Sequence, residues 1–153
     1  MKKLLVALLV LSSANLFAQK KTDDIARLNT ENYDFGKVKQ NTPPTATITV
    51  TNIGNEPLII EQATPSCGCT VSDYTKAPIA PGKTGTITAT YNAAALGPIN
   101  KTLTVKFAGA DDPKFIKLTG EVLAPDAYAA YQAAHPDAKK SKKETKETGT
   151  SKS

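Results

Sequence analysis

Hydrophobic and polar residues alternate in several short runs along the middle of the chain. In the three clearest runs, every second residue is apolar and the residues between are mostly threonine: Ala46-Ile48-Val50, Ile87-Ala89-Tyr91 and Leu103-Val105-Phe107. A period of two is typical of a β-strand that buries one face. Threonine also favours strands, because its branched side chain fits a pleated surface. The pattern therefore predicts strands over residues 45–51, 84–91 and 102–107.

Clusters of glycine and proline separate these runs from weaker ones. The weaker runs predict strands at residues 25–28, 58–60, 70–74 and 115–118, and no helical periodicity intervenes. About seven strands in a body of roughly 100 residues indicate an all-β, immunoglobulin-like sandwich over residues 25–123. An open barrel is the alternative.

The N-terminal residues have the order of a secretory signal peptide. A basic start, Lys2-Lys3, precedes an apolar run from Leu4 to Leu11, and small residues follow. We assign residues 1–18 to the signal peptide, with cleavage between Ala18 and Gln19. The run is much shorter than the ~20 residues that span a bilayer, so we expect no stable membrane insertion after cleavage. The protein is then periplasmic or extracellular, and residues 19–24 form a flexible N-terminus.

The C-terminal residues differ in composition from the body. Residues 124–138 predict a linker and a short alanine-rich helix over Ala127–Ala134, with Asp126 as its N-cap. Residues 139–153 hold lysine, serine and threonine but no apolar side chain, which predicts a disordered basic tail. Such a tail can contact an anionic surface electrostatically, although a solubilising role is the simpler interpretation.

The net charge of +5 belongs to the ends of the chain. Lys2 and Lys3 leave with the signal peptide, and the tail carries six lysines against two glutamates. The body is close to neutral, so nothing predicts a nucleic-acid partner.

The only two cysteines, Cys67 and Cys69, lie one residue apart in the segment Ser66-Cys67-Gly68-Cys69-Thr70. Their Cα atoms can approach within the ~4.4–6.8 Å that a disulfide requires, and Gly68 relaxes the backbone of the small ring. A structural pair, as a disulfide or packed thiols, is the favoured interpretation. Thiol–disulfide exchange is the first alternative, although no basic residue or helix N-terminus nearby would lower a thiol pKa.

Metal binding and covalent catalysis are further alternatives for the same pair. Two thiolates can hold Cu(I), whereas structural zinc needs four ligands, and the chain offers one distant histidine, His135. A cysteine nucleophile would need His135 beside it.

Asp111 and Asp112 form a pair of adjacent carboxylates, but their place between Gly109 and Pro113 is typical of a hairpin turn. The sequence therefore predicts no catalytic residue, no metal site and no cofactor.

Several motifs resemble one bacterial family, the exported proteins catalogued as domain of unknown function 1573. The motifs lie at residues 33–38, 50–60, 65–70, 79–83 and 118–122: YDFGKV, VTNIGNEPLII, PSCGCT, IAPGK and LTGEV. The family in turn resembles the immunoglobulin-like domains of major sperm protein and the PapD chaperones. The resemblance implies that fold and an envelope location, and it brings no established activity. Chaperone function does not transfer, because the residues that anchor a carboxylate in PapD have no counterpart here.

Two functions of different classes follow. The first is a non-enzymatic envelope module that binds another envelope protein by pairing at a sheet edge. The second is a thiol-active protein that uses Cys67 and Cys69 for weak disulfide exchange or Cu(I) binding. The sequence favours the first, because no other residues support thiol chemistry.

Overall fold

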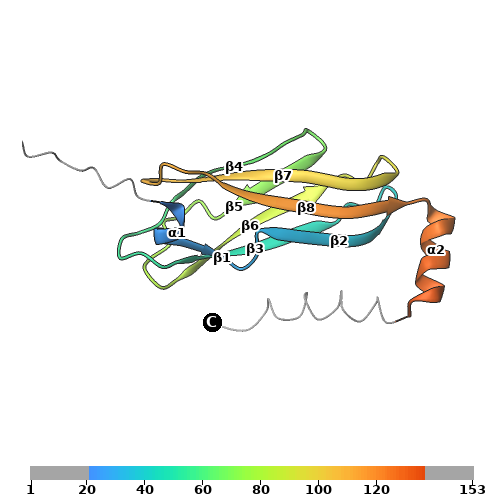
Figure 1. Cartoon of the computed structure of the whole chain (residues 1–153), viewed down its shortest axis with the longest axis horizontal. Coiled ribbons are helices and arrows are strands. Elements are labelled where there is room, and N and C mark those ends of the chain that lie inside the picture. The colour runs from blue at the N-terminus through green and yellow to red at the C-terminus, as the bar shows by residue number, and fades with distance from the viewer. Residues whose placement is uncertain (1–20, 137–153) are drawn as a thin grey trace, which may run out of the picture.

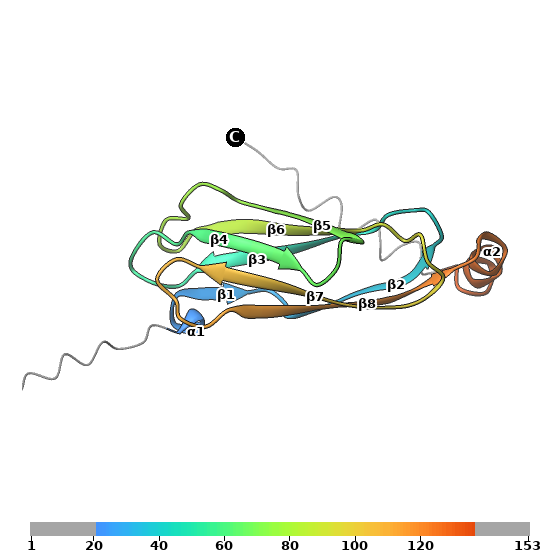
Figure 2. The same cartoon turned by 90° about the horizontal axis from the view of Figure 1, so that it is seen from above.

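The computed structural model describes residues 21–136, which form two four-stranded β-sheets packed face to face (Figures 1 and 2). The strands are β1 (Ala26–Leu28), β2 (Asn32–Lys39), β3 (Thr45–Asn52), β4 (Ile60–Pro65), β5 (Thr70–Tyr74), β6 (Thr84–Tyr91), β7 (Gly97–Phe107) and β8 (Lys114–Leu123). Two helices, α1 (Thr22–Ile25) and α2 (Pro125–Ala134), flank them.

The strand order confirms the predicted immunoglobulin-like sandwich. One sheet has the order β1-β3-β6-β5, and the other has β2-β8-β7-β4. With β2 set aside, these are the two sheets of a constant-type immunoglobulin domain. The eighth strand arises because the first strand of that fold is divided. Its first part, β1, pairs antiparallel with β3, and its second part, β2, pairs parallel with β8.

Strand β2 was not predicted as a strand, and its backbone explains why. The register of β2 against β8 shifts between Asp34 and Lys37, and Gly36 has a φ of +65°. This bulge places the buried Phe35 and Val38 three positions apart. The period of two is therefore lost where a sequence pattern would look for it.

The predicted inward positions form the core between the sheets. Ile48, Ile87 and Leu103 are fully buried, as are their apolar neighbours at every second position. The alternate threonines of β3 and β6 lie on the outer face as four cross-strand pairs: Thr45–Thr90, Thr47–Thr88, Thr49–Thr86 and Thr51–Thr84. The strand limits differ in detail. β7 already begins at Gly97, within the expected turn, and β4 begins at Ile60 rather than residue 58.

Helix α2 lies at one end of the sandwich and α1 at the other (Figure 1). The predicted N-cap was wrong. Ala124 occupies that position without a side-chain cap, Pro125 begins the helix, and Asp126 lies in the first turn. A carboxylate there still stabilises the helix, because its negative charge is attracted to the positive end of the helix dipole. Within residues 21–136, no helix is long and apolar enough to cross a membrane.

The segment expected to be flexible, residues 19–24, is partly ordered. Thr22 is fully buried, its N–H donates to Oδ1 of Asp112 at 2.7 Å, and its hydroxyl donates to the Asp112 carbonyl at 2.5 Å. Lys114, whose side chain is 14% exposed, lies between Asp23 (2.5 Å) and Glu31 (3.0 Å). The segment is ordered because the hairpin between β7 and β8 holds α1 through Asp112 and Lys114. The predicted signal peptide, the cleavage site at Ala18 and Gln19, and the tail at 139–153 lie outside the described residues.

Asn52 organises the loops beside α1 from a buried position. Its Nδ2 donates to the carbonyls of Glu56 and Ile79, each at 2.7 Å, and its Oδ1 accepts from the Gly54 N–H at 2.9 Å. Every polar atom of this amide is therefore used. The asparagine in the family-like motif VTNIGNEPL thus has a structural role that its position in a turn cluster did not reveal.

We expect Asn52→Leu to lower the free energy of unfolding by about 2–4 kcal/mol, because two carbonyls lose their buried donor. Urea denaturation of the variant measures the change. Asn55→Ala, in the exposed part of the same loop, is the matched control and should behave like the unmodified protein. An Asn52→Leu variant of unchanged stability would contradict the structural role.

The contact between Thr22 and Asp112 predicts a pH dependence of stability. The hydrogen bond from the Thr22 N–H holds the pKa of the Asp112 carboxyl below its ordinary value of 3.8. A carboxyl whose pKa is lowered by folding stabilises the protein above its unfolded pKa, and the effect disappears as the pH falls through the folded pKa. Asp112→Asn keeps an acceptor without the charge.

We therefore expect Asp112→Asn to be less stable than the unmodified protein at pH 6. The difference should begin to shrink as the pH falls through about 4 and should vanish below the lowered, folded-state pKa of Asp112. Urea midpoints measured across this range give the comparison. Asp111→Asn, one residue away, is the control for net charge. A difference that stays constant with pH would show that the Asp112 charge contributes nothing.

Candidate functional site

The Cys67-Gly68-Cys69 segment lies in the turn where the chain passes from one sheet to the other. Strand β4 ends at Pro65 in one sheet, and β5 begins at Thr70 in the other. At its start, the Ser66 N–H donates to the Thr102 carbonyl of β7 at 2.8 Å. At its end, the Cys69 carbonyl accepts from the Asn92 N–H at 2.9 Å. The turn is thus anchored to both sheets.

The structure joins Cys67 and Cys69 by a disulfide, with their Cα atoms 5.3 Å apart. Both residues are half-buried, and Cys69 packs against the core. The hydroxyl of Thr70, a residue only 3% exposed, lies 3.9 Å from Sγ of Cys67. The geometry is that of the disulfide interpretation, one of the forms that the sequence left open. Among residues 21–136, no three side chains of the metal-ligating types are grouped.

Gly68 does not have the role expected of it. Its φ lies outside the left-handed region, and a Cβ built there would meet no atom within 4 Å. The tight ring therefore forms without the conformational freedom that glycine provides.

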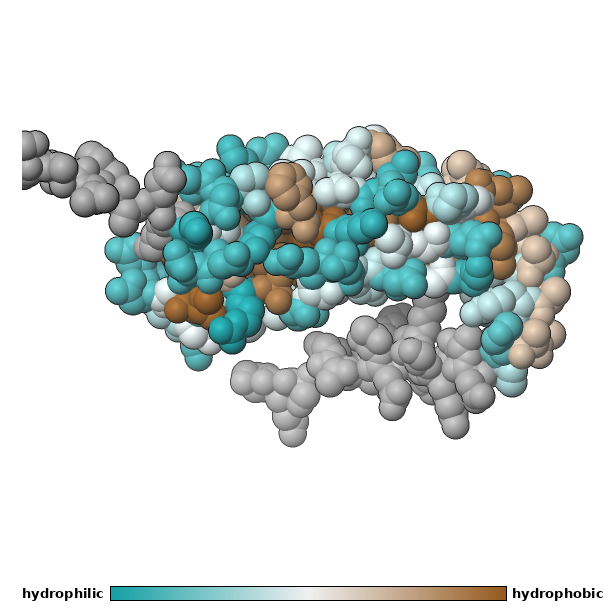
Figure 3. All heavy atoms as spheres, viewed as in Figure 1, coloured by the Kyte–Doolittle hydropathy of each residue, from teal (hydrophilic) through white to brown (hydrophobic). Residues whose placement is uncertain are grey.

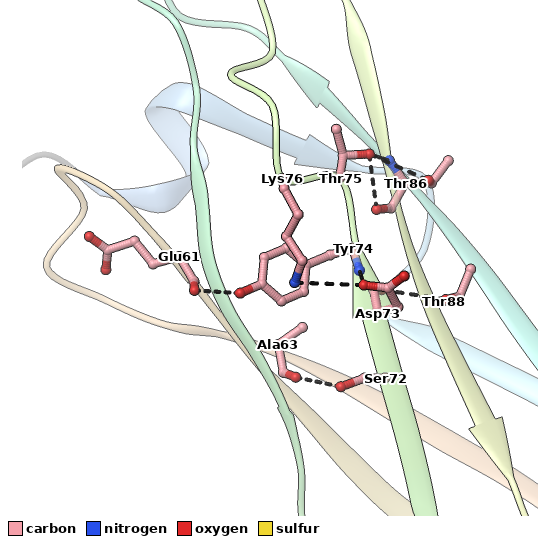
Figure 4. A network of polar contacts seen from close by, with 9 residues as sticks. All are labelled: Glu61, Ala63, Ser72, Asp73, Tyr74, Thr75, Lys76, Thr86 and Thr88. Atoms are coloured by element: carbon pink, nitrogen blue, oxygen red, sulfur yellow. Dashed lines mark hydrogen bonds and ion pairs between the residues drawn. The ribbon is translucent and has the colours of Figure 1, made fainter.

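Beyond the turn, β4 and β5 run along each other without forming a ladder. The residues that flank β5 bond toward β6: the Cys69 carbonyl accepts from the Asn92 N–H, and the Thr75 N–H donates to the Thr86 carbonyl. Backbone groups of successive strand residues point in alternate directions, so the N–H and carbonyl of Ser72 face away from β6. The Ser72 hydroxyl donates to the Ala63 carbonyl at 2.5 Å, and the Tyr74 hydroxyl donates to the Glu61 carbonyl at 2.6 Å. We call this contact the β4–β5 seam (Figure 4).

Tyr74 is the largest side chain of the seam. Its ring extends from β5 toward β4, and Nζ of Lys76 lies 3.2 Å from the ring centroid (Figure 4). Lys76 also pairs with Asp73 at 3.6 Å, although both of these side chains are largely exposed. This group could not be predicted from the sequence, because the alternation of Thr70–Tyr74 shows the two faces of β5 but not which strand lies beside it.

The other sheet edges offer little to a pairing strand. β1 has three residues, and β2 contains the bulge and the lysines 37 and 39. The N–H and carbonyl of Asn32 both bond to the Thr30 hydroxyl, and Lys37 pairs with Glu121. Bulges, lysines and local caps are the usual protection of edge strands.

Val71 of β5 stands out among the exposed apolar residues. It pairs with Thr90 on the outer face and is 71% exposed, more than Phe115 (58%) or Leu96 (56%). On the face seen in Figure 3, apolar residues form small, separate groups among hydrophilic ones. The turn end of β5 therefore combines an edge strand with an exposed apolar side chain.

A shallow hollow lies beside the turn, on the outer face of the other sheet. It has a volume of about 420 Å³ and is lined by Gln62, Thr64, Pro65, Ser66, Thr104 and Lys106. All of its lining residues except Pro65 are polar, but Lys106 is the one titratable side chain among them, so the hollow offers no acid–base pair.

The remaining candidates do not meet the cysteines. His135 is exposed at the end of α2, where its ring stacks on Tyr131 with a centroid distance of 4.5 Å. Its Nδ1 lies 3.0 Å from the Tyr131 carbonyl. Asp111 and Asp112 lie in the hairpin between β7 and β8, as predicted, and Asp112 holds Thr22.

A family model matches residues 26–122, nearly the whole sandwich. The chain belongs to the family described as "Protein of unknown function (DUF1573)". The family that the sequence motifs indicated is therefore confirmed. Among curated proteins, none matches the sequence.

Several solved structures share the fold at low sequence identity. A protein of unknown function from Porphyromonas gingivalis W83 matches with a TM-score of 0.58 and 17% identity, over 72% of this chain and 51% of that one. PapD-like domain 7 of human CEP192 matches with a TM-score of 0.53 and 9% identity, over 69% and 89%. The secreted serine protease VesC from Vibrio cholerae matches with a TM-score of 0.52 and 17% identity, over 72% and 27%.

These matches describe a domain rather than whole proteins. The chain spans about half of the Porphyromonas protein and about a quarter of the protease. At these identities the likeness shows the fold alone. It agrees with the two-sheet sandwich described above, and it brings no activity.

We expect Gly68→Ala to keep the fold and the disulfide, with stability unchanged or raised by up to about 1 kcal/mol, because the position accepts a Cβ. Intact mass after alkylation reports the disulfide, and thermal unfolding reports the stability. The control is Gly109→Ala, where space is also open but φ is +77°. That variant should lose about 1 kcal/mol. A Gly68→Ala protein with two free thiols would show that glycine is needed.

Proposed function

We propose that this protein is a non-enzymatic, exported module of the cell envelope that binds another envelope protein along its β4–β5 side. The observation that carries the proposal is the exposure of Val71 on the edge strand β5, directly after the anchored turn. An edge strand with an exposed apolar side chain suits recognition of an extended segment, which adds main-chain hydrogen bonds and side-chain contacts.

The other edges support this choice by exclusion. β1 is too short to guide a partner strand, and β2 is interrupted by its bulge and by local hydrogen bonds. The envelope location rests on the signal-peptide pattern of residues 1–18.

We expect a photo-crosslinking residue at position 71 to give an adduct of defined mass with an envelope protein in intact cells. The same residue at Thr47, on the outer face of β3, should give none. Ser72→Pro, which removes the N–H directed away from β6, should abolish the adduct. The purified protein should begin at Gln19, as measured by intact mass.

Equal adducts at positions 47 and 71 would contradict recognition at the β4–β5 side. A protein that retains residues 1–18 and stays with the cytoplasm would contradict export. Replacing both cysteines by serine also separates this proposal from the thiol alternative. Binding would survive the replacement, whereas exchange activity or Cu(I) binding would be lost.

A further inference from the structure

The β4–β5 seam is closed by few interactions. The two strands belong to different sheets and share no ladder. Two side-chain hydroxyls, from Ser72 and Tyr74, reach the carbonyls of Ala63 and Glu61. The turn with the disulfide joins the strands at one end. The seam can therefore open without breaking a β-ladder.

Tyr74 and Ser72 occupy the place of a pairing strand. They pair with the buried Ile87 and Ala89, so their side chains start from the inner side of the sheet and extend across its edge to β4. Their hydroxyls satisfy two carbonyls that a partner strand would otherwise bond. In the closed seam, an incoming strand has no access to these groups.

The disulfide restrains the chain at the point where the seam begins. The loop that it closes is very short, so by chain entropy it contributes less to global stability than the ~3 kcal/mol of a 15-residue loop. Reduction should then leave the sandwich folded and act locally. The Thr70 hydroxyl, 3.9 Å from Sγ of Cys67, is placed to donate to that sulfur when it becomes a thiolate.

We propose that the Cys67–Cys69 disulfide is a redox latch on the β4–β5 seam, which a dithiol reductant opens. One thiolate of the reductant attacks a sulfur of the pair, and the second thiolate resolves the mixed disulfide. The reductant leaves as a cyclic disulfide, and two electrons and two protons pass to Cys67 and Cys69. The turn then relaxes, and the Ser72 and Tyr74 bonds to β4 weaken.

The opened seam exposes a defined pairing surface. β5 presents the N–H and carbonyl of Ser72 beside Val71, whereas Pro65 leaves β4 without an N–H at its end. An extended peptide segment with an apolar residue over Val71 fits this edge. This part of the inference rests on the proposed function, because it regulates the same site.

The latch itself is tested without a partner, by native-state hydrogen exchange of the mature protein with and without dithiothreitol. A β5 strand that is no longer held to β4 should separate from β6 more often, so we expect exchange across residues 70–75 to become about tenfold faster on reduction, while β8 stays protected. Cys67→Ser/Cys69→Ser should exchange like the reduced protein in either condition. Equal protection of β5 in both redox states would overturn the latch.

A second variant separates the seam from the turn. Tyr74→Phe removes the bond to Glu61 and should speed exchange of β5 while the disulfide remains, whereas Tyr33→Phe on β2 should not. If Tyr74→Phe leaves β5 as protected as before, the seam is not the element that opens.

The cross-link at position 71 then distinguishes the two proposals. A larger adduct yield in the double serine variant supports the latch together with the binding site. An adduct of equal yield in both backgrounds keeps the proposed function and overturns redox control. Faster exchange without any adduct in either background keeps the latch and overturns the partner site.

Discussion

The fold depends on one constraint: each sheet has a single apolar face, and the two faces must cover each other. Ile48 and Ile87 from one sheet and Leu103 and Ile116 from the other are fully buried between them. The two open sides of such a sandwich are closed by chain that changes sheets. On one side the chain passes from β1 to β2, and on the other it passes from β4 through the cysteine turn to β5. The cysteine turn of the candidate site therefore also closes one open side of the sandwich.

The core and the fold class followed from the sequence because they obey a simple period. The apolar positions of β3, β6 and β7 repeat every two residues, and each repeat lies inward as expected. Where the backbone departs from that period, the pattern failed. The bulge in β2 hid a strand, and α1 was missed because its stability comes from Asp112 and Lys114, about ninety residues away.

The candidate site was predictable only in part. The cysteine pair could be found because both residues lie in one short segment. Its neighbours could not, since Ser72 and Tyr74 act on carbonyls of a strand in the opposite sheet. Asn52 was hidden for a related reason, because a turn asparagine and a buried hub asparagine look alike in a sequence. Contacts between side chains and distant backbone leave no local pattern.

The parallel pair of β2 and β8 has a consequence for the order in which the molecule can form. It joins residues 32–39 to residues 117–123, so the second strand of the chain finds its place only beside the last. A chain that emerges N-terminus first, from a ribosome or a translocation channel, must hold β2 unpaired until β8 has followed. Long-range pairing of this kind slows folding, because loop closure precedes the contacts that reward it. The bulge and the lysines of β2 then protect an exposed strand from other chains during that delay.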